Sequence, residues 1–342
     1  MTRELLNTLY VGTHDARLFL KDESVVVKLE DEQLLRVPLH HLGSICVFGI
    51  VHPSVPLMLK CAEEGRSVVF FDMNGRFKAR LQGKSTGNVL LRRDQWSGAL
   101  CEVTSLSLAK SIVAGKLQNA RQVLLRGARD YPEDAETLQD AALEHAAGLD
   151  SLEDAATLDE VRGMEGNAAS AYFGAFPKLI RVPTQEFSFS IRSRRPPRDR
   201  MNALLSFAYS LGTSDCASAL EGVGLDPQCG YLHALRPGRP ALALDLLEEF
   251  RSVWLDRLCL NLVNRRELKA GDFVEGEGGS WRLTDDARKL VLAAYQNRKK
   301  LEVQHEILKG KVPIGLLPHL QARLLARFLR GELPVYTPWM VN

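Results

Sequence analysis

The sequence lacks several features that would at once assign it to a particular class of protein. It has no run of 18 apolar residues, so no segment is expected to span a membrane as a helix. The opening residues do not form the apolar core of a secretory signal, and none of the six cysteines belongs to a C-x-x-C pair. We therefore expect a cytoplasmic, reduced protein with no membrane partner, no disulfide framework and no zinc ribbon.

A strong net charge is also missing. The sequence has 44 basic and 42 acidic side chains, a balance of +2 that excludes a uniformly basic, histone-like surface. The charges are nevertheless segregated. Residues 130–160 contain eleven acids and no Lys or Arg, whereas residues 178–200 contain seven basic residues and residues 288–330 contain ten, with two acids in each. Two basic blocks in one half of the chain favour a polyanionic partner.

The chain has enough apolar material for a large core. Its 342 residues are 45% hydrophobic and 25% charged, close to the averages for globular proteins. At roughly 150 residues per domain, this length suggests two domains.

The first 90 residues are predicted to form a small β-rich domain. Short segments rich in β-branched and large apolar residues are separated by Asp, Glu, Lys and Gly, a pattern typical of strands. The predicted strands cover residues 8–11, 16–20, 24–29, 34–37, 44–48 and 67–71. One helix is predicted between Pro53 and Gly65, because proline suits the first turn of a helix and glycine its end.

After Arg93 the apolar residues recur every three or four positions, which indicates amphipathic helices. The first of these stripes consists of Leu106, Ala109, Val113, Leu117, Ala120 and Leu124. Further helices are predicted over residues 134–147, 152–176, 201–211, 241–263, 288–309 and 321–329. We therefore expect an α+β fold in which the β-rich domain, residues 1–90, precedes a larger all-α domain, residues 91–342. The boundary is expected within residues 83–95, where Gly83-Lys84-Ser85-Thr86-Gly87-Asn88 is typical of a linker.

Two local patterns are weak signs of chemistry. Gly83-Lys84-Ser85 lacks the upstream glycine of a phosphate-binding loop, because Lys78 occupies that position. Cys229 precedes His233 by four residues, but so short a separation rarely gives the geometry of a thiol nucleophile and its base.

The segment around Glu165 is more informative. An apolar helical stripe runs through Leu158, Val161, Met164, Ala168, Tyr172 and Phe176, with Glu165 at its margin. Gly163 and Gly166 each cost about 1 kcal/mol in a helix interior. Close approach of a ligand or of another backbone is the usual reason for such glycines.

A second cluster suggests a metal site. Asp245 and Glu248 are three residues apart in a leucine-rich helix, so both carboxylates lie on one partly buried face, where like charges repel unless a cation neutralises them. A bound metal is one such cation, and Arg251 is the competing one. With His233 nearby and no thiolate, the donors suit Mg²⁺ or Mn²⁺, and the imidazole favours Mn²⁺.

Together these residues form an ordered set of motifs. They are Glu165-Gly166 with Ala169 and Tyr172-Phe173, then Leu232-His233 with Gly238-Arg239-Pro240, then Asp245-Leu246-Leu247-Glu248-Glu249-Phe250-Arg251. In order and spacing they resemble the CRISPR-associated endonucleases that integrate new spacers, the larger, catalytic members of the adaptation pair. The resemblance covers essentially the whole chain. The opening Leu6-Asn7-Thr8-Leu9-Tyr10-Val11 and the tail Leu333-Pro334-Val335-Tyr336-Thr337-Pro338-Trp339 resemble the subtype I-C branch.

The resemblance implies metal ligands at Glu165, His233 and Glu248, and an acidic active-site position at Asp245. Family members often have Asp where Glu248 stands. A Lys-x-x-Asn-Gln pattern common in the family appears here as Lys116-Leu117-Gln118-Asn119-Ala120, and because Ala120 replaces the glutamine we assign this stretch no site role.

The resemblance also implies a function and partners. It implies an endonuclease and integrase of antiviral defence, in which a protospacer 3′-hydroxyl attacks a phosphodiester at the edge of a CRISPR repeat. The implied partners are protospacer duplex, leader–repeat DNA, a second copy joined through the β-rich domain, and a small dimeric adaptation protein. Two alternatives are a mobile-element integrase with the same active site and a non-catalytic helical protein that binds nucleic acid.

The loop Ile191–Arg200 is a candidate DNA contact. It holds five arginines and two prolines, which exclude a regular helix, and it lies between Glu165 and His233 in the sequence. Arginine provides a bidentate fork for phosphates, so its arginines are expected to bind the DNA backbone, unless the loop is merely solvated. The candidate DNA-binding residues are Arg194, Arg195, Arg198, Tyr209, Arg239 and Arg251. Tyr209 either stacks on a base or belongs to the core.

Overall fold

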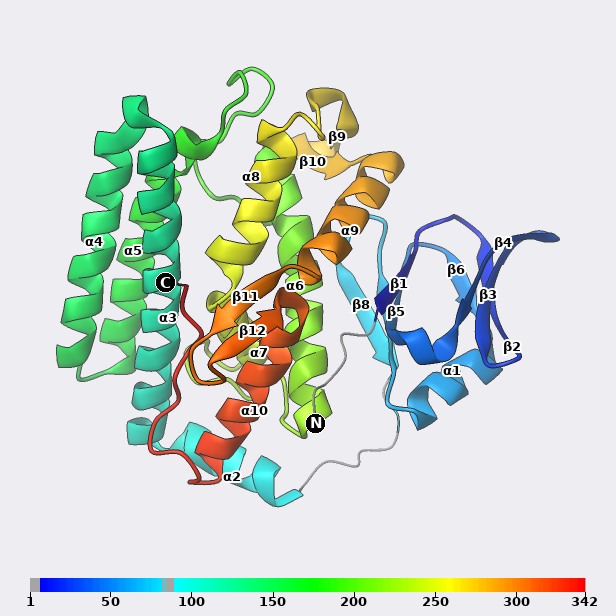
Figure 1. The fold of residues 1–342 in the computed structure, drawn as a ribbon, viewed down its shortest axis with the longest axis horizontal. Coiled ribbons are helices and arrows are strands. Elements are labelled where there is room, and N and C mark those ends of the chain that lie inside the picture. Colours follow the sequence, from blue (N-terminus) through cyan, green and yellow to red (C-terminus); the bar gives the residue numbers. More distant parts are fainter. Residues whose placement is uncertain (1–6, 82, 84–88, 342) are drawn as a thin grey trace. The chain divides into compact units, whose positions relative to one another are not determined.

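The computed structural model describes residues 7–81, 83 and 89–341 (Figure 1). The chain divides into two compact units, one made of residues 1–86 with 284–301 and the other of residues 87–283 with 302–342. The predicted linker, apart from Gly83, lies outside the described residues, as does Leu6. Within the described ranges, no helix is both long enough and apolar enough to cross a membrane.

The first unit contains two four-stranded sheets. In spatial order, the first sheet consists of β1 (Asn7–Val11), β5 (Leu42–Phe48), β7 (Ser67–Phe71) and β8 (Phe77–Leu81). The second consists of β4 (Glu32–Pro38), β3 (Ser24–Leu29), β2 (Ala16–Lys21) and β6 (Val51–Pro53). β1, β5 and β7 are parallel, and β2, β3 and β4 are antiparallel. All six predicted strands are confirmed, and β6 and β8 are additional.

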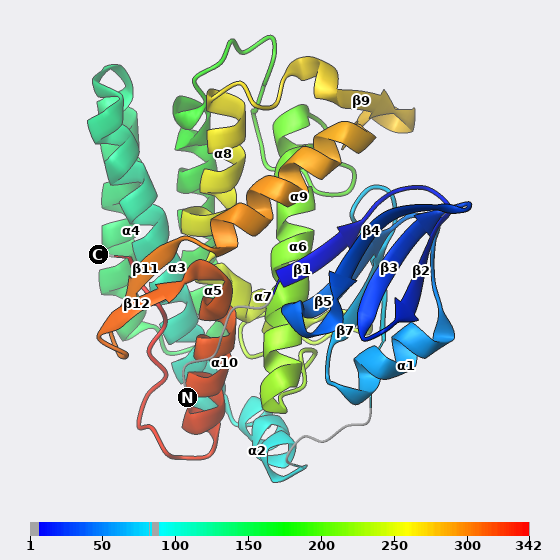
Figure 2. The same ribbon diagram turned by 45° about the vertical axis from the view of Figure 1, so that its right-hand side comes forward.

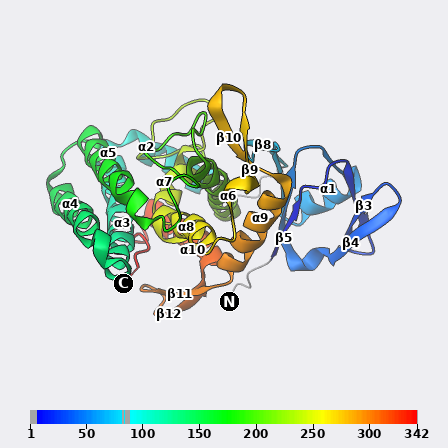
Figure 3. The ribbon, with the colours of Figure 1, turned by 90° about the horizontal axis from the view of Figure 1, so that it is seen from above.

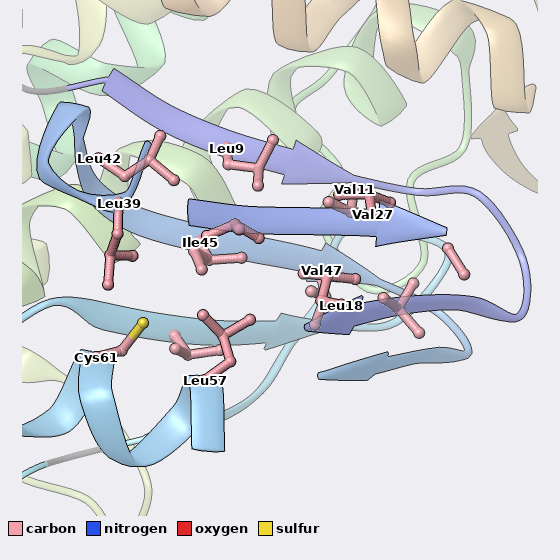
Figure 4. Close-up of a cluster of buried hydrophobic side chains, with 14 residues drawn as sticks. Leu9, Val11, Leu18, Val27, Leu39, Leu42, Ile45, Val47, Leu57 and Cys61 are labelled. Carbon is pink, nitrogen blue, oxygen red and sulfur yellow. The ribbon is translucent and has the colours of Figure 1, made fainter. Parts of the chain in front are cut away.

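Side chains from both sheets and from α1 (Val55–Glu63) pack into one hydrophobic core (Figure 4). In β2, Ala16 and Leu18 are buried while Arg17 and Phe19 are exposed, as expected for a strand with one face toward a core. α1 adds Leu57 and Cys61 to this core and lies against β2 and β7 (Figure 2). The predicted helix between Pro53 and Gly65 is therefore confirmed.

The first unit also includes α9 (Asp285–Lys299), which is distant in the sequence. Thr284 caps its first turn by accepting a hydrogen bond from Ala287 N at 3.3 Å. α9 packs against β1, and the buried Arg288 guanidinium donates to the carbonyl of Met73. The sequence placed this helix in the helical domain and extended it to Lys309, whereas it ends at Lys299 and belongs to the first unit.

The second unit is mainly helical. Its helices are α2 (Val89–Leu100), α3 (Glu102–Asp130), α4 (Ala135–Asp154), α5 (Leu158–Ala175), α6 (Arg200–Val223), α7 (Ala241–Glu248), α8 (Arg257–Asn264) and α10 (Leu317–Leu329). α3, α4 and α5 pack side by side, as Figures 1 and 3 show. A π-helical turn, Arg251–Asp256, interrupts the predicted helix 241–263 between α7 and α8.

The second unit is not entirely helical, which corrects the all-α expectation. It contains two antiparallel hairpins, β9 (Phe273–Gly276) with β10 (Ser280–Leu283), and β11 (Glu302–His305) with β12 (Gly310–Pro313). The second hairpin replaces the end of the helix predicted to reach Lys309. A residue with positive φ, Lys309, followed by Gly310 provides the turn that a helix could not contain.

Candidate metal and catalytic site

The candidate site is assembled from two helices and a loop of the second unit. Glu165 lies on α5, His233 lies in the loop between α6 and α7, and Asp245 and Glu248 lie on α7. α5 begins with a complete capping box, in which Thr157 accepts from Glu160 N and Glu160 accepts from Thr157 N. Local sequence therefore fixes the start of the helix that carries Glu165.

Asp245 holds His233 in one orientation. Its Oδ1 atom accepts the backbone N–H of His233 at 3.0 Å and lies 2.7 Å from His233 Nδ1. Its Oδ2 atom accepts the backbone N–H groups of Tyr231 and Leu232 at 2.7 and 3.1 Å. With Nδ1 occupied, the other ring nitrogen, Nε2, lies 3.9 Å from Glu248 Oε1. Both oxygens of Asp245 are thus engaged by the histidine and its flanking backbone, so Asp245 positions the imidazole.

Gly230 permits this arrangement. A Cβ atom at this position would lie 2.8 Å from Asp245 Oδ2 and 2.8 Å from the carbonyl carbon of Ala241, both closer than real contacts allow. The sequence analysis did not single out Gly230, because only the fold brings α7 against the loop.

Glu248 is a buried carboxylate surrounded by cations. Arg251 donates to Glu248 Oε1 at 2.6 Å, and Lys116 Nζ lies 2.8 Å from Glu248 Oε2. Burial alone would raise the pKa of Glu248, but Arg251, Lys116 and His233 together hold this pKa well below its usual range. Glu248 is therefore ionised, and Arg251 does balance part of its charge, as the competing explanation required.

Lys116 is the residue that the sequence analysis missed. It lies on α3 and its ammonium group contacts Glu165 Oε1 as well as Glu248 Oε2, so it joins the carboxylates of α5 and α7. The interpretation that residues 116–120 have no site role is therefore wrong for Lys116. It rested on Ala120, one turn further along α3, which is buried and has no polar group to contribute.

The side chains of Glu165, His233 and Glu248 have the donor atoms that a divalent ion needs. Their positions do not yet form a coordination site. No cluster of three or more His, Cys, Asp or Glu side chains in the described part of the chain is placed to hold a metal. Instead, the Lys116 ammonium is the shared partner of the two carboxylates. A cation already bridges Glu165 and Glu248, and an imidazole nitrogen faces Glu248, which is the donor set that Mg²⁺ or Mn²⁺ would take.

A buried network lies beside this site. Asp256 accepts hydrogen bonds from Tyr172 OH at 3.0 Å and Tyr209 OH at 2.5 Å. The guanidinium groups of Arg192 and Arg251 lie over the Tyr209 ring, 5.2 and 4.6 Å from its centroid. These contacts favour the core interpretation of Tyr209 over the base-stacking one. They also engage Arg251, which is therefore not a free contact for DNA.

Four arginines of the second unit lie close to one another. Burial lowers the pKa of Arg239, and Arg236, Arg194 and Arg195 lower it further, because their like charges lie close to it. Within the described residues, none of these four side chains has a hydrogen bond or ion pair. By contrast, Arg198 donates to Gly278 O at 2.6 Å, which ties it to the β9–β10 hairpin. Arg236, which the sequence analysis did not single out, belongs with Arg194, Arg195 and Arg239.

The neighbour of Glu248 has a different role. Glu249 is fully buried and accepts hydrogen bonds from Tyr336 OH, from Trp339 N at 2.8 Å and from Gln321 Nε2 at 2.9 Å. Burial raises the pKa of Glu249 to about 7. Asn119 on α3 donates to the carbonyls of Glu249 and Trp339. The C-terminal tail is thus anchored next to the site.

Two further expectations are resolved by the geometry. A Cβ atom at Gly163 or Gly166 would meet nothing within 4 Å, so among the described residues no backbone approaches these glycines closely, and close packing within this part of the chain does not explain them. Cys229 is buried, which raises the pKa of its thiol to about 12, so it is not an activated nucleophile.

The chain is similar to known proteins over most of its length. Residues 9–297 match the family described as CRISPR associated protein Cas1. The chain is 53% identical over 338 residues to CRISPR-associated endonuclease Cas1 1 of Moorella thermoacetica, covering 98% of both chains. It is 49% identical over 346 residues to CRISPR-associated endonuclease Cas1 2 of Rhodospirillum rubrum, covering 98% of this chain and 99% of that protein.

Solved structures share the fold at lower identity. A casposase bound to integration product matches with a TM-score of 0.85 at 22% identity, over 97% of this chain and 93% of that chain. A Cas1 protein from Thermotoga maritima matches with a TM-score of 0.79 at 24% identity, over 96% of this chain and 98% of that chain. These likenesses support the α+β architecture, and the sequence matches identify the chain as a member of the Cas1 family of CRISPR-associated endonucleases.

Proposed function

We propose that Glu165, His233 and Glu248 bind the divalent ion, Mg²⁺ or Mn²⁺, with which this CRISPR-adaptation endonuclease and integrase acts on DNA. The observation that carries the proposal is that one ammonium group, that of Lys116, pairs with both carboxylates, while His233 Nε2 lies 3.9 Å from Glu248 Oε1. When bound, the ion would align a 3′-hydroxyl nucleophile and stabilise charge on the phosphate oxygens.

The chain's own residues prepare this site. Asp245 holds the Nδ1 side of the imidazole, so that Nε2 remains a donor toward Glu248. Arg251 keeps Glu248 ionised through its 2.6 Å contact with Oε1. The Asp245 side chain is fully buried and the Arg251 side chain is 12% exposed, so water screens both contacts weakly.

The DNA backbone is proposed to lie against Arg194, Arg195, Arg236 and Arg239. Four unpaired guanidinium groups repel one another, and phosphates would relieve that repulsion. The Asp245 charge acts on Arg239, and Asp245 contacts His233, so a phosphate bound by Arg239 would lie near the proposed ion. Arg198, Arg251 and Tyr209 have protein partners instead and are not included in this surface.

The proposed substrates and partners extend the family assignment. The DNA is proposed to be a protospacer duplex and the leader–repeat end of a CRISPR array, and the protein partners a second copy joined through the first unit and a small dimeric adaptation protein. Fold relatives in a Cas6-RT-Cas1–Cas2 complex and in a casposase bound to integration product support binding to a partner and to DNA. We also propose a subtype I-C system, on the opening and tail motifs, and a reducing cytoplasmic setting, because all six cysteines are free.

The alternatives are less well supported. A mobile-element integrase is favoured by the fold of the casposase, but its 22% identity shows the fold alone, whereas relatives at 53% and 49% identity are CRISPR-associated endonucleases. A non-catalytic binding protein would not need an ionised carboxylate at full burial with two cations beside it.

Strand transfer in defined DNA tests the proposal. The chain, with its small partner, is mixed with a short duplex and repeat-containing DNA in EDTA, Mg²⁺ or Mn²⁺. Joining is expected only with a divalent ion and is expected to be lost in Glu165→Gln and Glu248→Gln. Joining in EDTA, or unchanged joining by both variants, would refute the proposed site.

A further inference from the structure

The Lys116 side chain occupies the position between the two proposed carboxylate ligands. It comes from α3, whereas Glu165 comes from α5 and Glu248 from α7, so a single ammonium group connects three helices. Its side chain is only 14% exposed, and the Glu248 side chain only 4%. Water screens this pair weakly, so the contact is stronger than an ordinary surface ion pair.

The carboxylates need a cation at this position. Two ionised carboxylates that face one point repel each other, and the repulsion increases as they are removed from water. Arg251 approaches Glu248 at Oε1, while Lys116 approaches it at Oε2 and also contacts Glu165. Lys116 is thus the cation that the two carboxylates share, as a bridging metal ion would be.

We propose that Lys116 is a built-in cation of the metal-free site, which competes with the divalent ion for Glu165 and Glu248. The inference rests on the proposed metal-binding function of these residues. An ammonium group is a compact charge on a flexible stem, so it can leave the carboxylates by rotating its own side chain. An ammonium and a divalent ion cannot both lie between two carboxylates, because their charges repel.

The structure offers a place for the displaced group. A cavity of about 20 Å³ adjoins Lys116 and is also lined by His145, Tyr209, Glu248 and Asp256. About 10–15 Å³ is enough for a water molecule, and an ammonium group is of similar size. His145 Nδ1 pairs with Ala141 O at 2.7 Å, which leaves Nε2 as an acceptor, and Asp256, whose oxygens accept from Tyr172 and Tyr209, also lines the cavity. Arg251 also lines the cavity and opposes the movement.

The proposal predicts that Lys116 weakens metal binding while stabilising the metal-free protein. The variant Lys116→Met keeps a side chain of similar length but has no ammonium group, so the competitor of the divalent ion is absent. Mn²⁺ should then bind about tenfold more tightly, within the usual range for coupling between two ligands of one site. In EDTA the same variant should melt at a lower temperature than the wild type. Saturating Mn²⁺ should abolish this difference in melting temperature.

The experiment compares the wild-type full chain with Lys116→Met and with Lys110→Met. Lys110 is on the same helix and its ammonium donates to Glu153 O at 2.8 Å, so its substitution removes the same charge away from the site. Mn²⁺ affinity is measured by titration calorimetry, and melting is measured in EDTA and in Mn²⁺. The proposal predicts tighter binding in Lys116→Met alone.

If Lys116→Met binds Mn²⁺ no more tightly than Lys110→Met does, the proposal about Lys116 is overturned. The proposed metal-binding function of Glu165, His233 and Glu248 would be unaffected by that result. If no chain binds Mn²⁺, or if Glu165→Gln binds it as the wild type does, the proposed function itself fails. Should Lys116→Met not fold in EDTA, Lys116→Gln is measured in the same way. Its uncharged amide can still donate to one carboxylate, and it too should bind Mn²⁺ more tightly.

Discussion

Asp245 contacts His233 twice through one oxygen: Oδ1 accepts the backbone N–H of His233 at 3.0 Å and lies 2.7 Å from its Nδ1 atom. The same carboxylate therefore fixes both the backbone and the ring. This relationship separates the two acidic residues of α7, because Asp245 orients the histidine while Glu248 faces it across the site.

The first prediction concerns Asp245→Asn. The amide has one acceptor oxygen and cannot accept the four N–H groups that the carboxylate faces, so at least one buried donor loses its partner at a cost of about 1–3 kcal/mol. Mn²⁺ affinity should fall by about 10- to 100-fold, as when the supporting partner of a ligand histidine is lost. Asp199→Ala removes the cap of α6 and should lower stability without changing Mn²⁺ affinity. Unchanged affinity in Asp245→Asn would show that Asp245 does not position a ligand.

The second prediction is that His233→Ala abolishes strand transfer but spares folding and DNA binding. The His233 side chain is 21% exposed and lies in a loop, so its removal creates no large cavity. Duplex affinity should come mainly from phosphate contacts made elsewhere. Strand transfer, circular dichroism and duplex affinity are compared with those of His52→Ala, a half-exposed histidine of the first unit. Loss of folding in His233→Ala would favour a structural histidine instead.

The third prediction concerns Gly166, which follows Glu165 on α5 and has open space where a side chain would lie. Because an added Cβ meets nothing within 4 Å, Gly166→Ala should stabilise the protein by about 0.5–1 kcal/mol. If DNA approaches this face closely, strand transfer should nevertheless decrease. Gly174→Ala, on the same helix and equally open, should stabilise without loss of strand transfer. Denaturant unfolding and strand transfer are measured on both variants, and full activity in Gly166→Ala would remove the close-approach explanation.

The fourth prediction concerns the arginine cluster. Substituting Arg194, Arg195 and Arg239 together by Ala should flatten the salt dependence of DNA binding. Each lost phosphate contact reduces the log–log slope by roughly 0.9 on duplex or 0.7 on single strand. The control replaces three exposed basic residues at and beyond the end of α8, Arg265, Arg266 and Lys269, and removes equal charge. Equal slopes and affinities for the two triple variants would leave the cluster without a role in binding.

The main elements of the fold could be predicted from local patterns. Alternation and apolar runs predicted β2, β3 and β5, and a period of three to four residues predicted the long helices α3 to α6. The β11–β12 hairpin was missed because the helical pattern of α9 continues past its true end, and the turn at Lys309 and Gly310 is a weaker signal. The place of α9 in the first unit depends on contacts with β1 and Met73, more than 200 residues away.

The sequence could predict that His233, Asp245 and Glu248 lie together, but not the contacts that support them. The spacing of Asp245 and Glu248 and the nearby His233 indicated shared chemistry. Their different roles depend on which way each side chain turns within one buried face, which spacing does not determine. Lys116 was missed because its partners lie 49 and 132 positions away, and only the packing of α3 against α5 and α7 brings them together.

The most direct test of the account is a crystal structure of the full chain with Mn²⁺, in which anomalous scattering locates the ion. The account predicts one ion bound to Glu165, His233 Nε2 and Glu248, with Asp245 still on His233 Nδ1 and the Lys116 ammonium withdrawn from both carboxylates. An ion bound elsewhere, or Lys116 still bridging Glu165 and Glu248 at saturating Mn²⁺, would contradict it.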